Sequence, residues 1–152
     1  MSVEEQLATL GSPLPPVFPP AANYVGAART GNLVFVSGHG PRLADGSYVT
    51  GKLGRERTLE EGYEAARLTV LACLASLKAE IGDLDRVTRF VKLLGMVNCT
   101  EDFQDQPAVI NGASDLLVAA FGDRGKHARS AVGMQMLPFN ISVEIEMVVE
   151  VG

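Results

Sequence analysis

Apolar residues recur along this chain with two different periods, which mark where helices and strands should form. After Thr58, apolar side chains return every three or four residues, the spacing of a helix with one buried face. Thr58 and Glu61 form a capping box before this segment, and Gly82 suits its end. The sequence therefore predicts a helix from there to about Ile81, with a buried stripe of Leu59, Tyr63, Ala66, Val70, Leu74 and Leu77.

Other segments carry the apolar runs or the strict alternation that strands show. Pro107 suits the first turn of a second helix that continues to Gly122. The Asp45-Gly46 pair is a hairpin turn signal. Strands are predicted at residues 33–38, 47–50, 86–97, 130–136 and 143–149.

The resulting order is strand, strand, helix, strand, helix, strand, strand, which indicates an α+β fold. Two helices cannot cover both faces of a sheet with so many strands, so we expect both helices on one face. The strands also carry apolar side chains on their other side. This favours a sheet whose second face packs against another subunit.

The first 22 residues differ in composition from the rest of the chain. Five of the eight prolines fall in PLPPVFPP, and proline fixes φ and removes a backbone donor. We expect an extended segment that wraps the surface, after a short helix at residues 3–10. The chain is thus divided into an N-terminal extension, residues 1–22, and one domain, residues 23–152.

Composition narrows the class of protein. The chain has 152 residues, is 47% hydrophobic, and carries a net charge of −5 without a Lys/Arg run. Nucleic-acid binding is therefore disfavoured, because it depends on clustered cations. The N-terminus lacks a basic, apolar leader and no apolar run is long enough to span a bilayer. With two cysteines that form no CxxC, a cytoplasmic protein without membrane association is expected.

Charged residues in the last strands are the candidates for chemistry. Arg129 begins one apolar run, and a guanidinium can hold a carboxylate through two parallel hydrogen bonds. Glu144 and Glu146 lie opposite Val143 and Ile145, on a face that is either wet or closed by a second subunit. In a closed site, a desolvated glutamate is a stronger base. An ion pair for Arg129 and a solvated face for the glutamates are the alternatives.

No pattern for a metal or a nucleotide is present. His39, between Gly38 and Gly40, and His127 are the only histidines, and no third ligand stands at metal spacing. The motifs GxGxxG, GxxxxGK[ST] and GxSxG are absent. We expect neither a metal nor a cofactor.

Two blocks of the chain resemble the RidA (YjgF, reactive intermediate deaminase) superfamily. ARSAVGMQMLPFNISVEIE, residues 128–146, is similar to its C-terminal signature, and NYVGAARTGNLVFVSGHGP, residues 23–41, is similar to its N-terminal block. VNCTEDF, residues 97–103, is similar to the segment that leads into its second helix. The long, proline-rich start resembles a branch of the superfamily whose role is poorly defined.

The resemblance implies a chorismate-mutase-like fold and a homotrimer, with the sheets around a barrel-like centre and a cleft between each pair of subunits. It also implies hydrolysis of enamines and imines, such as 2-aminoacrylate, to 2-oxo acids and ammonia. Arg129 would bind the substrate carboxylate and Glu144 would position the attacking water. Substrate-binding positions would be Tyr24, Gly38, His39, Asn111 and Ala131.

The chain departs from the deaminase pattern at two of these positions. Ala131 stands where deaminases often carry cysteine, and His39 stands where they often carry glutamine. A trimer that binds small carboxylates without converting them is therefore the alternative function. The endoribonuclease or translation-inhibitor activity attributed to some relatives is a third, disfavoured by the acidic charge.

Overall fold

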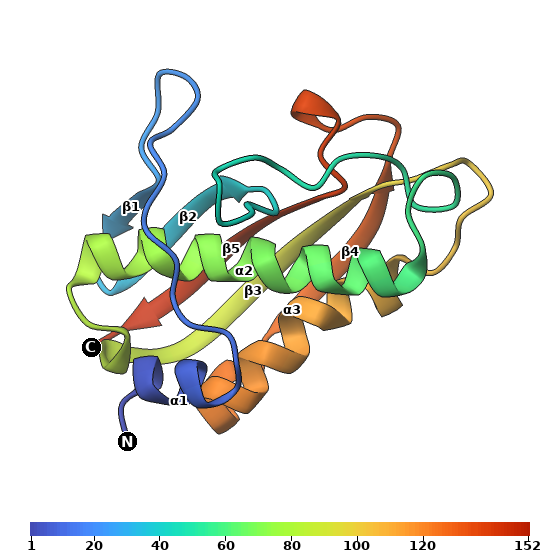
Figure 1. Cartoon of the computed structure of the whole chain (residues 1–152). Coiled ribbons are helices and arrows are strands. Elements are labelled where there is room, and N and C mark those ends of the chain that lie inside the picture. Colours follow the sequence, from blue (N-terminus) through green and yellow to red (C-terminus); the bar gives the residue numbers. More distant parts are fainter.

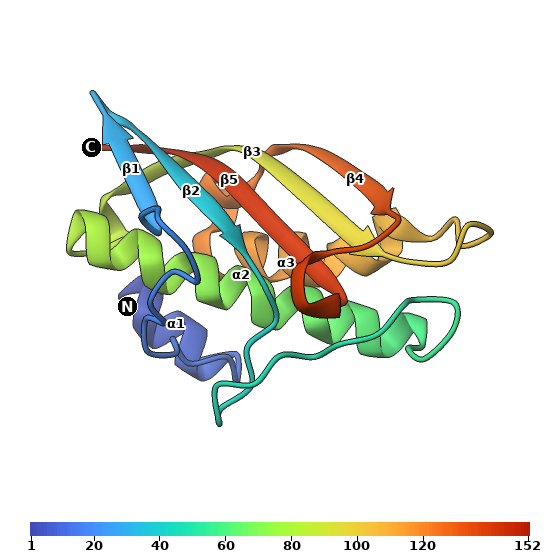
Figure 2. The same cartoon turned by 90° about the horizontal axis from the view of Figure 1, so that it is seen from above.

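A computed structural model describes all 152 residues and shows a five-stranded sheet with two long helices on one face (Figures 1 and 2). The strands are β1 Ala27–Thr30, β2 Leu33–His39, β3 Val87–Asn98, β4 Ala128–Met134 and β5 Val143–Val151. The helices are α1 Val3–Thr9, α2 Leu59–Ile81 and α3 Gln106–Phe121, with short 3-10 turns at Leu84–Arg86, Gly122–Gly125 and Pro138–Asn140. The predicted α+β class, with both long helices on one face, is confirmed.

The sheet is mixed, with strand order β1-β2-β5-β3-β4. Only β3 and β4 run parallel, and the other neighbours are antiparallel. On β5, Val143, Ile145, Met147 and Val149 point to the helices and are buried. The sheet therefore has one dry face under α2 and α3 and one open face.

The predicted limits of the two long helices are confirmed. Thr58 and Glu61 form the capping box of α2, and Gly82 ends it at φ 88°, a conformation that glycine adopts without strain. Pro107 lies in the first turn of α3. Most of the predicted stripe of α2 is buried, but Leu59 and Tyr63 are exposed.

The exposure of Leu59 and Tyr63 has a packing reason. At this end α2 turns Gly62 to the core, where an added Cβ would lie 2.6 Å from Leu53. α3 approaches so closely that a Cβ on Gly112 would lie 1.9 Å from the Tyr63 carbonyl oxygen. The small residues bring the backbones together and carry the larger side chains outward.

The first strands differ from the prediction. Residues 47–50 form no strand; Tyr48 and Thr50 each make a single bridge, to Arg42 and Ile141. β1 was not predicted, because Ala27–Thr30 lacks an apolar run. It pairs with β2 through a tight turn at Gly31, where φ is 57°.

The start of the chain packs against the domain. Val3 and Leu7 of α1 are buried within the same hydrophobic core as α2, α3 and the sheet. The segment after α1 has no regular structure and runs across α2 toward β1 (Figure 1). This route brings Phe18 to Ala21 against the C-terminal end of β2, which extends past the start of the outer strand β1; we call this place the β2 edge.

The open face carries apolar and acidic side chains together. Phe35 and Val132 are 48% and 38% exposed, and Glu144 and Glu146 lie on the same face. No helix combines the length and the apolar content that crossing a bilayer requires.

Candidate functional site

Arg129 lies at the β4 edge of the sheet and is held by α3. Its Nη1 donates to Asn111 Oδ1 at 2.9 Å and to Ser114 Oγ at 3.1 Å, and its Nη2 donates to the Pro107 carbonyl at 3.4 Å. All three acceptors are uncharged, and Arg129 makes no salt bridge. The guanidinium is thus positioned while its full charge stays available to an anion. Asn111, one of the expected substrate-binding residues, thus contacts Arg129 within one chain.

A second layer of hydrogen bonds supports this arginine. Ser114 Oγ lies 2.9 Å from His127 Nε2, and His127 Nδ1 lies 2.7 Å from the Gly125 carbonyl oxygen. Because a carbonyl only accepts, the proton is on Nδ1, and Nε2 accepts from the Ser114 hydroxyl. The serine oxygen is then oriented to accept from Arg129. The sequence analysis did not identify Ser114, since nothing in the pattern distinguishes it from other helical serines.

Glu144 lies on the open face and against Gly38. A Cβ added to Gly38 would lie 2.2 Å from Glu144 Oε2, so only glycine leaves room for the carboxylate there. Glu144 is half-buried and makes no hydrogen bond or salt bridge within the chain. Burial, followed by the charge of Glu146, raises the pKa of Glu144 above its ordinary value. The result is a carboxylate with increased basicity and unused acceptor capacity.

Within one chain, Arg129 and Glu144 leave the sheet on opposite faces. Arg129 is aligned with Leu93, which is fully buried under the helices, whereas Glu144 is aligned with Met96 on the other side of β3. A single copy therefore does not bring the two expected catalytic residues together. Ala131 is partly buried against the core and lies on the same face of the sheet as Arg129.

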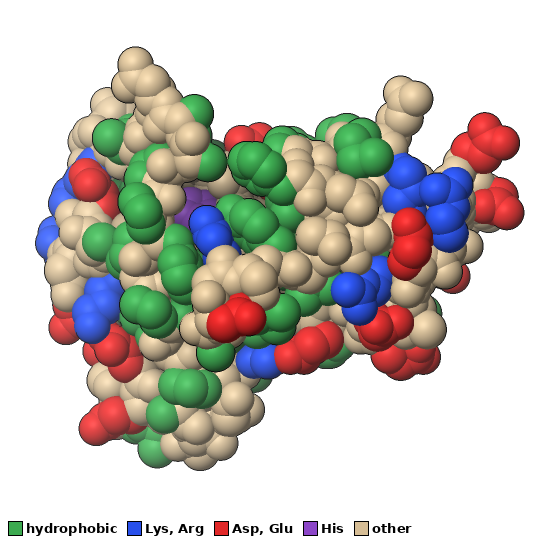
Figure 3. All heavy atoms as spheres, turned by 45° about the horizontal axis from the view of Figure 1, so that its top comes forward, with side chains coloured by type: hydrophobic (Ala, Val, Ile, Leu, Met, Phe, Trp, Pro, Cys, Tyr) green, Lys and Arg blue, Asp and Glu red, His purple; other side chains and the backbone are tan.

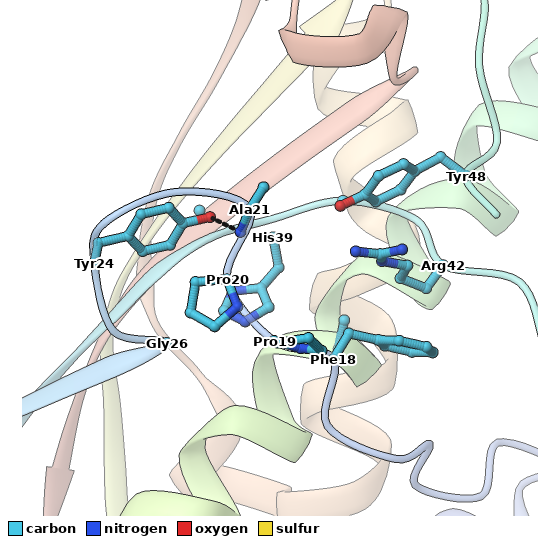
Figure 4. Close-up of a pocket in the computed structure, with 12 residues that line it drawn as sticks. Phe18, Pro19, Pro20, Ala21, Tyr24, Gly26, His39, Arg42 and Tyr48 are labelled. Carbon is cyan, nitrogen blue, oxygen red and sulfur yellow. Dashed lines mark hydrogen bonds between the residues drawn. The ribbon is translucent and has the colours of Figure 1, made fainter. Parts of the chain in front are cut away.

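A small cavity lies at the β2 edge, beyond the start of β1. Its volume is about 40 Å³, and Tyr24, Gly38 and His39 line it together with the proline-rich segment (Figure 4). Three of the expected substrate-binding residues thus lie together, and one of them, Gly38, also lies against Glu144. Figure 3, seen obliquely from the helix-covered side, shows hydrophobic side chains around a hollow in which Lys/Arg and His surface is visible.

His39 contributes to the cavity wall with both ring nitrogens already bonded. Nδ1 lies 2.5 Å from the Ser37 carbonyl oxygen, so it carries the proton, and Nε2 lies 2.7 Å from Ser76 Oγ, which donates to it. Burial is the main cause that lowers the pKa of His39, with Arg42 adding to it. The ring is therefore a neutral, fixed part of the wall rather than a free base.

The structure adds to this cavity a residue that the sequence analysis did not select. Arg42 lines the cavity between the rings of Phe18 and Tyr48. Tyr48 is a local bridge partner of Arg42, whereas Phe18 meets Arg42 only after the N-terminal segment folds across α2. No cluster of three or more His, Cys, Asp or Glu side chains is arranged to hold a metal ion.

Comparisons with known proteins agree on one family. Residues 4–151 match the family model described as "YjgF/chorismate_mutase-like, putative endoribonuclease". The chain is 44% identical to Protein TCP17 of Trypanosoma cruzi, over 99% of this chain and 94% of that protein. It is 28% identical to the 2-iminobutanoate/2-iminopropanoate deaminase of Dermatophagoides farinae, over 92% and 93% of the two chains. The crystal structure of protein Atu1372 from Agrobacterium tumefaciens, of unknown function, superposes with a TM-score of 0.91 at 43% identity, covering 99% of this chain and 92% of that one.

Proposed function

Because the chain belongs to the YjgF/chorismate-mutase-like family, we propose that it hydrolyses 2-imino acids and their enamine tautomers to 2-oxo acids and ammonia. The observation that carries this proposal is Glu144, a basic carboxylate without a partner, placed against Gly38. The deaminase relative, named for 2-iminobutanoate and 2-iminopropanoate, supports the same class of substrate.

The proposed site is completed by neighbouring copies of the chain, in a homotrimer. One copy supplies Arg129 with Asn111, and the next supplies Glu144, Gly38 and Tyr24. Two features support this arrangement: the separation of Arg129 and Glu144 on opposite faces of one sheet, and the exposed apolar side chains Phe35 and Val132 on the open face. Apolar surface of this kind is typical of subunit interfaces.

Each group has a defined task in the proposed reaction. Arg129 binds the substrate carboxylate through parallel hydrogen bonds. Glu144 takes a proton from a water whose oxygen attacks the imine carbon, and passes that proton to the imine nitrogen, which gives a carbinolamine. Glu144 then takes the hydroxyl proton of the carbinolamine and returns it to the nitrogen as the C–N bond breaks, so ammonia leaves and the carbonyl of the 2-oxo acid remains. The imine carbon is already electrophilic, so positioning of water and substrate provides most of the acceleration.

The test generates 2-iminobutanoate from L-2-aminobutyrate with an L-amino-acid oxidase and follows its loss by trapping with semicarbazide. We expect the protein to accelerate hydrolysis. Glu144→Gln and Arg129→Gln should each lower kcat/KM by roughly 100-fold or more. Glu146→Gln, two residues along the same face, and Arg55→Gln, at an exposed position, are the matched controls.

The controls should retain most of the activity. Glu146→Gln should also move the acidic limb of the pH profile slightly lower, since the charge of Glu146 helps to raise the pKa of Glu144. Saturable binding of 2-oxo acids without any acceleration would contradict hydrolysis and favour a carboxylate-binding protein.

A further inference from the structure

The cavity at the β2 edge is lined by hydrogen-bond donors and contains no acid. No Asp or Glu is among its lining residues, whereas Arg42, Tyr24 and Tyr48 all reach it. Figure 4 shows the Arg42 guanidinium and the Tyr48 hydroxyl pointing toward the interior from one side, with Tyr24 on the other. An anion is the kind of group that such a lining accepts.

Arg42 is held in place without being neutralised. Its guanidinium carbon lies 4.7 Å from the centre of the Phe18 ring and 4.1 Å from the centre of the Tyr48 ring. Nη1 donates to the Gly46 carbonyl at 2.5 Å, and no carboxylate forms a salt bridge with it. The remaining N–H groups have no acceptor within the chain.

The two tyrosine hydroxyls also have capacity to donate. The Ala21 N–H donates to Tyr24 Oη at 3.4 Å, so that oxygen acts as acceptor and its own proton is free. The Tyr48 hydroxyl makes no hydrogen bond, although its ring is fixed by stacking with Phe139 at 6.2 Å between centroids. Three donors, Tyr24 and the bridge-paired Arg42 and Tyr48, therefore line one small volume.

The cavity adjoins the proposed catalytic glutamate. Gly38 lines the cavity, and the same residue is in contact with the Glu144 carboxylate. The volume of about 40 Å³ suits one small group, since a single water needs about 10–15 Å³ on the same measure. One end of a substrate, rather than a whole substrate, would fit.

We infer that Arg42 is a specificity-determining residue, and that the preferred substrates are 2-imino acids with a second, distal carboxylate. This inference rests on the proposed function. Arg129 of one copy binds the carboxylate beside the imine carbon, and Arg42, with Tyr24 and Tyr48, binds the distal carboxylate.

The test compares 2-iminoglutarate, made from glutamate with a glutamate oxidase, with 2-iminobutanoate as the single-carboxylate substrate. Wild-type protein should show a higher kcat/KM for 2-iminoglutarate. Arg42→Gln should lower that value roughly 10- to 100-fold, because a charge-assisted hydrogen bond is lost. Hydrolysis of 2-iminobutanoate should change less than about threefold, and Arg55→Gln should change neither.

Two further measurements keep the outcome interpretable. Tyr48→Phe retains the ring that packs on Arg42 and removes only the hydroxyl, so it should weaken 2-iminoglutarate hydrolysis selectively even if Arg42→Gln folds poorly. Calorimetric binding of 2-oxoglutarate and 2-oxobutanoate reports the anion site without chemistry.

The outcomes separate the two proposals. Arg42-dependent binding of 2-oxoglutarate in a protein that hydrolyses no imine would contradict the proposed function and support the anion site. Equal losses on both substrates and both ligands, or no preference for the second carboxylate in the wild type, would overturn the role of Arg42.

Discussion

At the β4 edge of the sheet, Arg129 receives three uncharged acceptors from α3, whereas at the β2 edge Arg42 is held by two aromatic rings and one carbonyl. Neither arginine meets a carboxylate within the chain. Both edges thus fix a guanidinium without neutralising it. They differ in origin: Arg129 is held by a helix of the core, whereas Arg42 is held by its own loop, through Tyr48 and Gly46, and by Phe18 of the N-terminal segment.

Glu144, the acidic residue of the candidate site, is not held by other groups of the chain. Glu144 has no hydrogen-bond donor within the chain, and burial raises its pKa. In the proposed site, the positioned cation of one copy would complement the carboxylate of the next copy, which has no partner within its own chain. Substrate binding would then be organised by the β4 and β2 edges, and water activation would depend on the space beside Gly38.

The largest effect on this comparison is expected from Gly38→Ala. The new methyl carbon would occupy a position 2.2 Å from Glu144 Oε2, so the carboxylate has to move. We expect kcat/KM for 2-iminobutanoate to fall roughly 10- to 100-fold, since such displacements misplace the attacking water. The measurement is the oxidase-coupled assay on purified protein, with thermal unfolding as a check of the fold.

The glycine substitution has its own control in a double variant. Adding Gly38→Ala to Glu144→Gln should produce little further loss, because the group that the methyl displaces has already lost its function. Full additivity of the two losses would show that Gly38 acts independently of Glu144.

A smaller effect is expected from Asn111→Ala, at the β4 edge. Arg129 would lose its 2.9 Å acceptor but keep Ser114 and the Pro107 carbonyl. KM should rise about three- to tenfold with a smaller change in kcat, because a less ordered guanidinium binds the carboxylate less well. Asn23→Ala, at an exposed position, is the matched control. A change in kcat alone would assign Asn111 to another role.

The smallest effect is expected on the pH dependence of stability, in the Glu144→Gln variant. The folded state raises the pKa of Glu144 above its ordinary 4.5, so ionisation of this group destabilises the fold as pH rises through that raised value. Glu144→Gln should therefore raise Tm by about a degree or two at neutral pH. The gain should vanish below pH 4.5, where wild-type Glu144 is protonated too. A gain that is constant with pH would point to packing instead.

The parts of the fold that the sequence predicted are those set by local pattern. The limits of α2 follow from Thr58, Glu61 and Gly82, and the buried face of β5 follows from strict alternation. β1 was not predicted, because its four residues, Ala27–Thr30, show no hydrophobic periodicity. A strand at 47–50 was predicted from its turn signal, yet only single bridges form there.

The sequence predicted residues of the candidate site only where the family resemblance selected them or where they belong to a single helix or strand. The resemblance selected Arg129, Asn111, Gly38 and Glu144 as site residues, and the structure adds that Arg129 contacts Asn111 and that Glu144 lies against Gly38. Arg42 was not found because Phe18, one of the two rings that pack on it, reaches it only through long-range folding, although Tyr48 is a local bridge partner. The sequence also did not reveal that Arg129 and Glu144 lie on opposite faces of the sheet, because this depends on the strand register.

Mixing of two inactive variants tests the shared site most directly. Arg129→Gln and Glu144→Gln chains are co-expressed with different tags, and the mixed assembly is purified and assayed on 2-iminobutanoate. If each site takes Arg129 from one copy and Glu144 from the next, every mixed trimer has one intact site of three, so the purified mixed assembly regains about a third of the wild-type activity. Activity that stays at the level of the two separate variants, although mixed assemblies have formed, would show that no site is shared between copies.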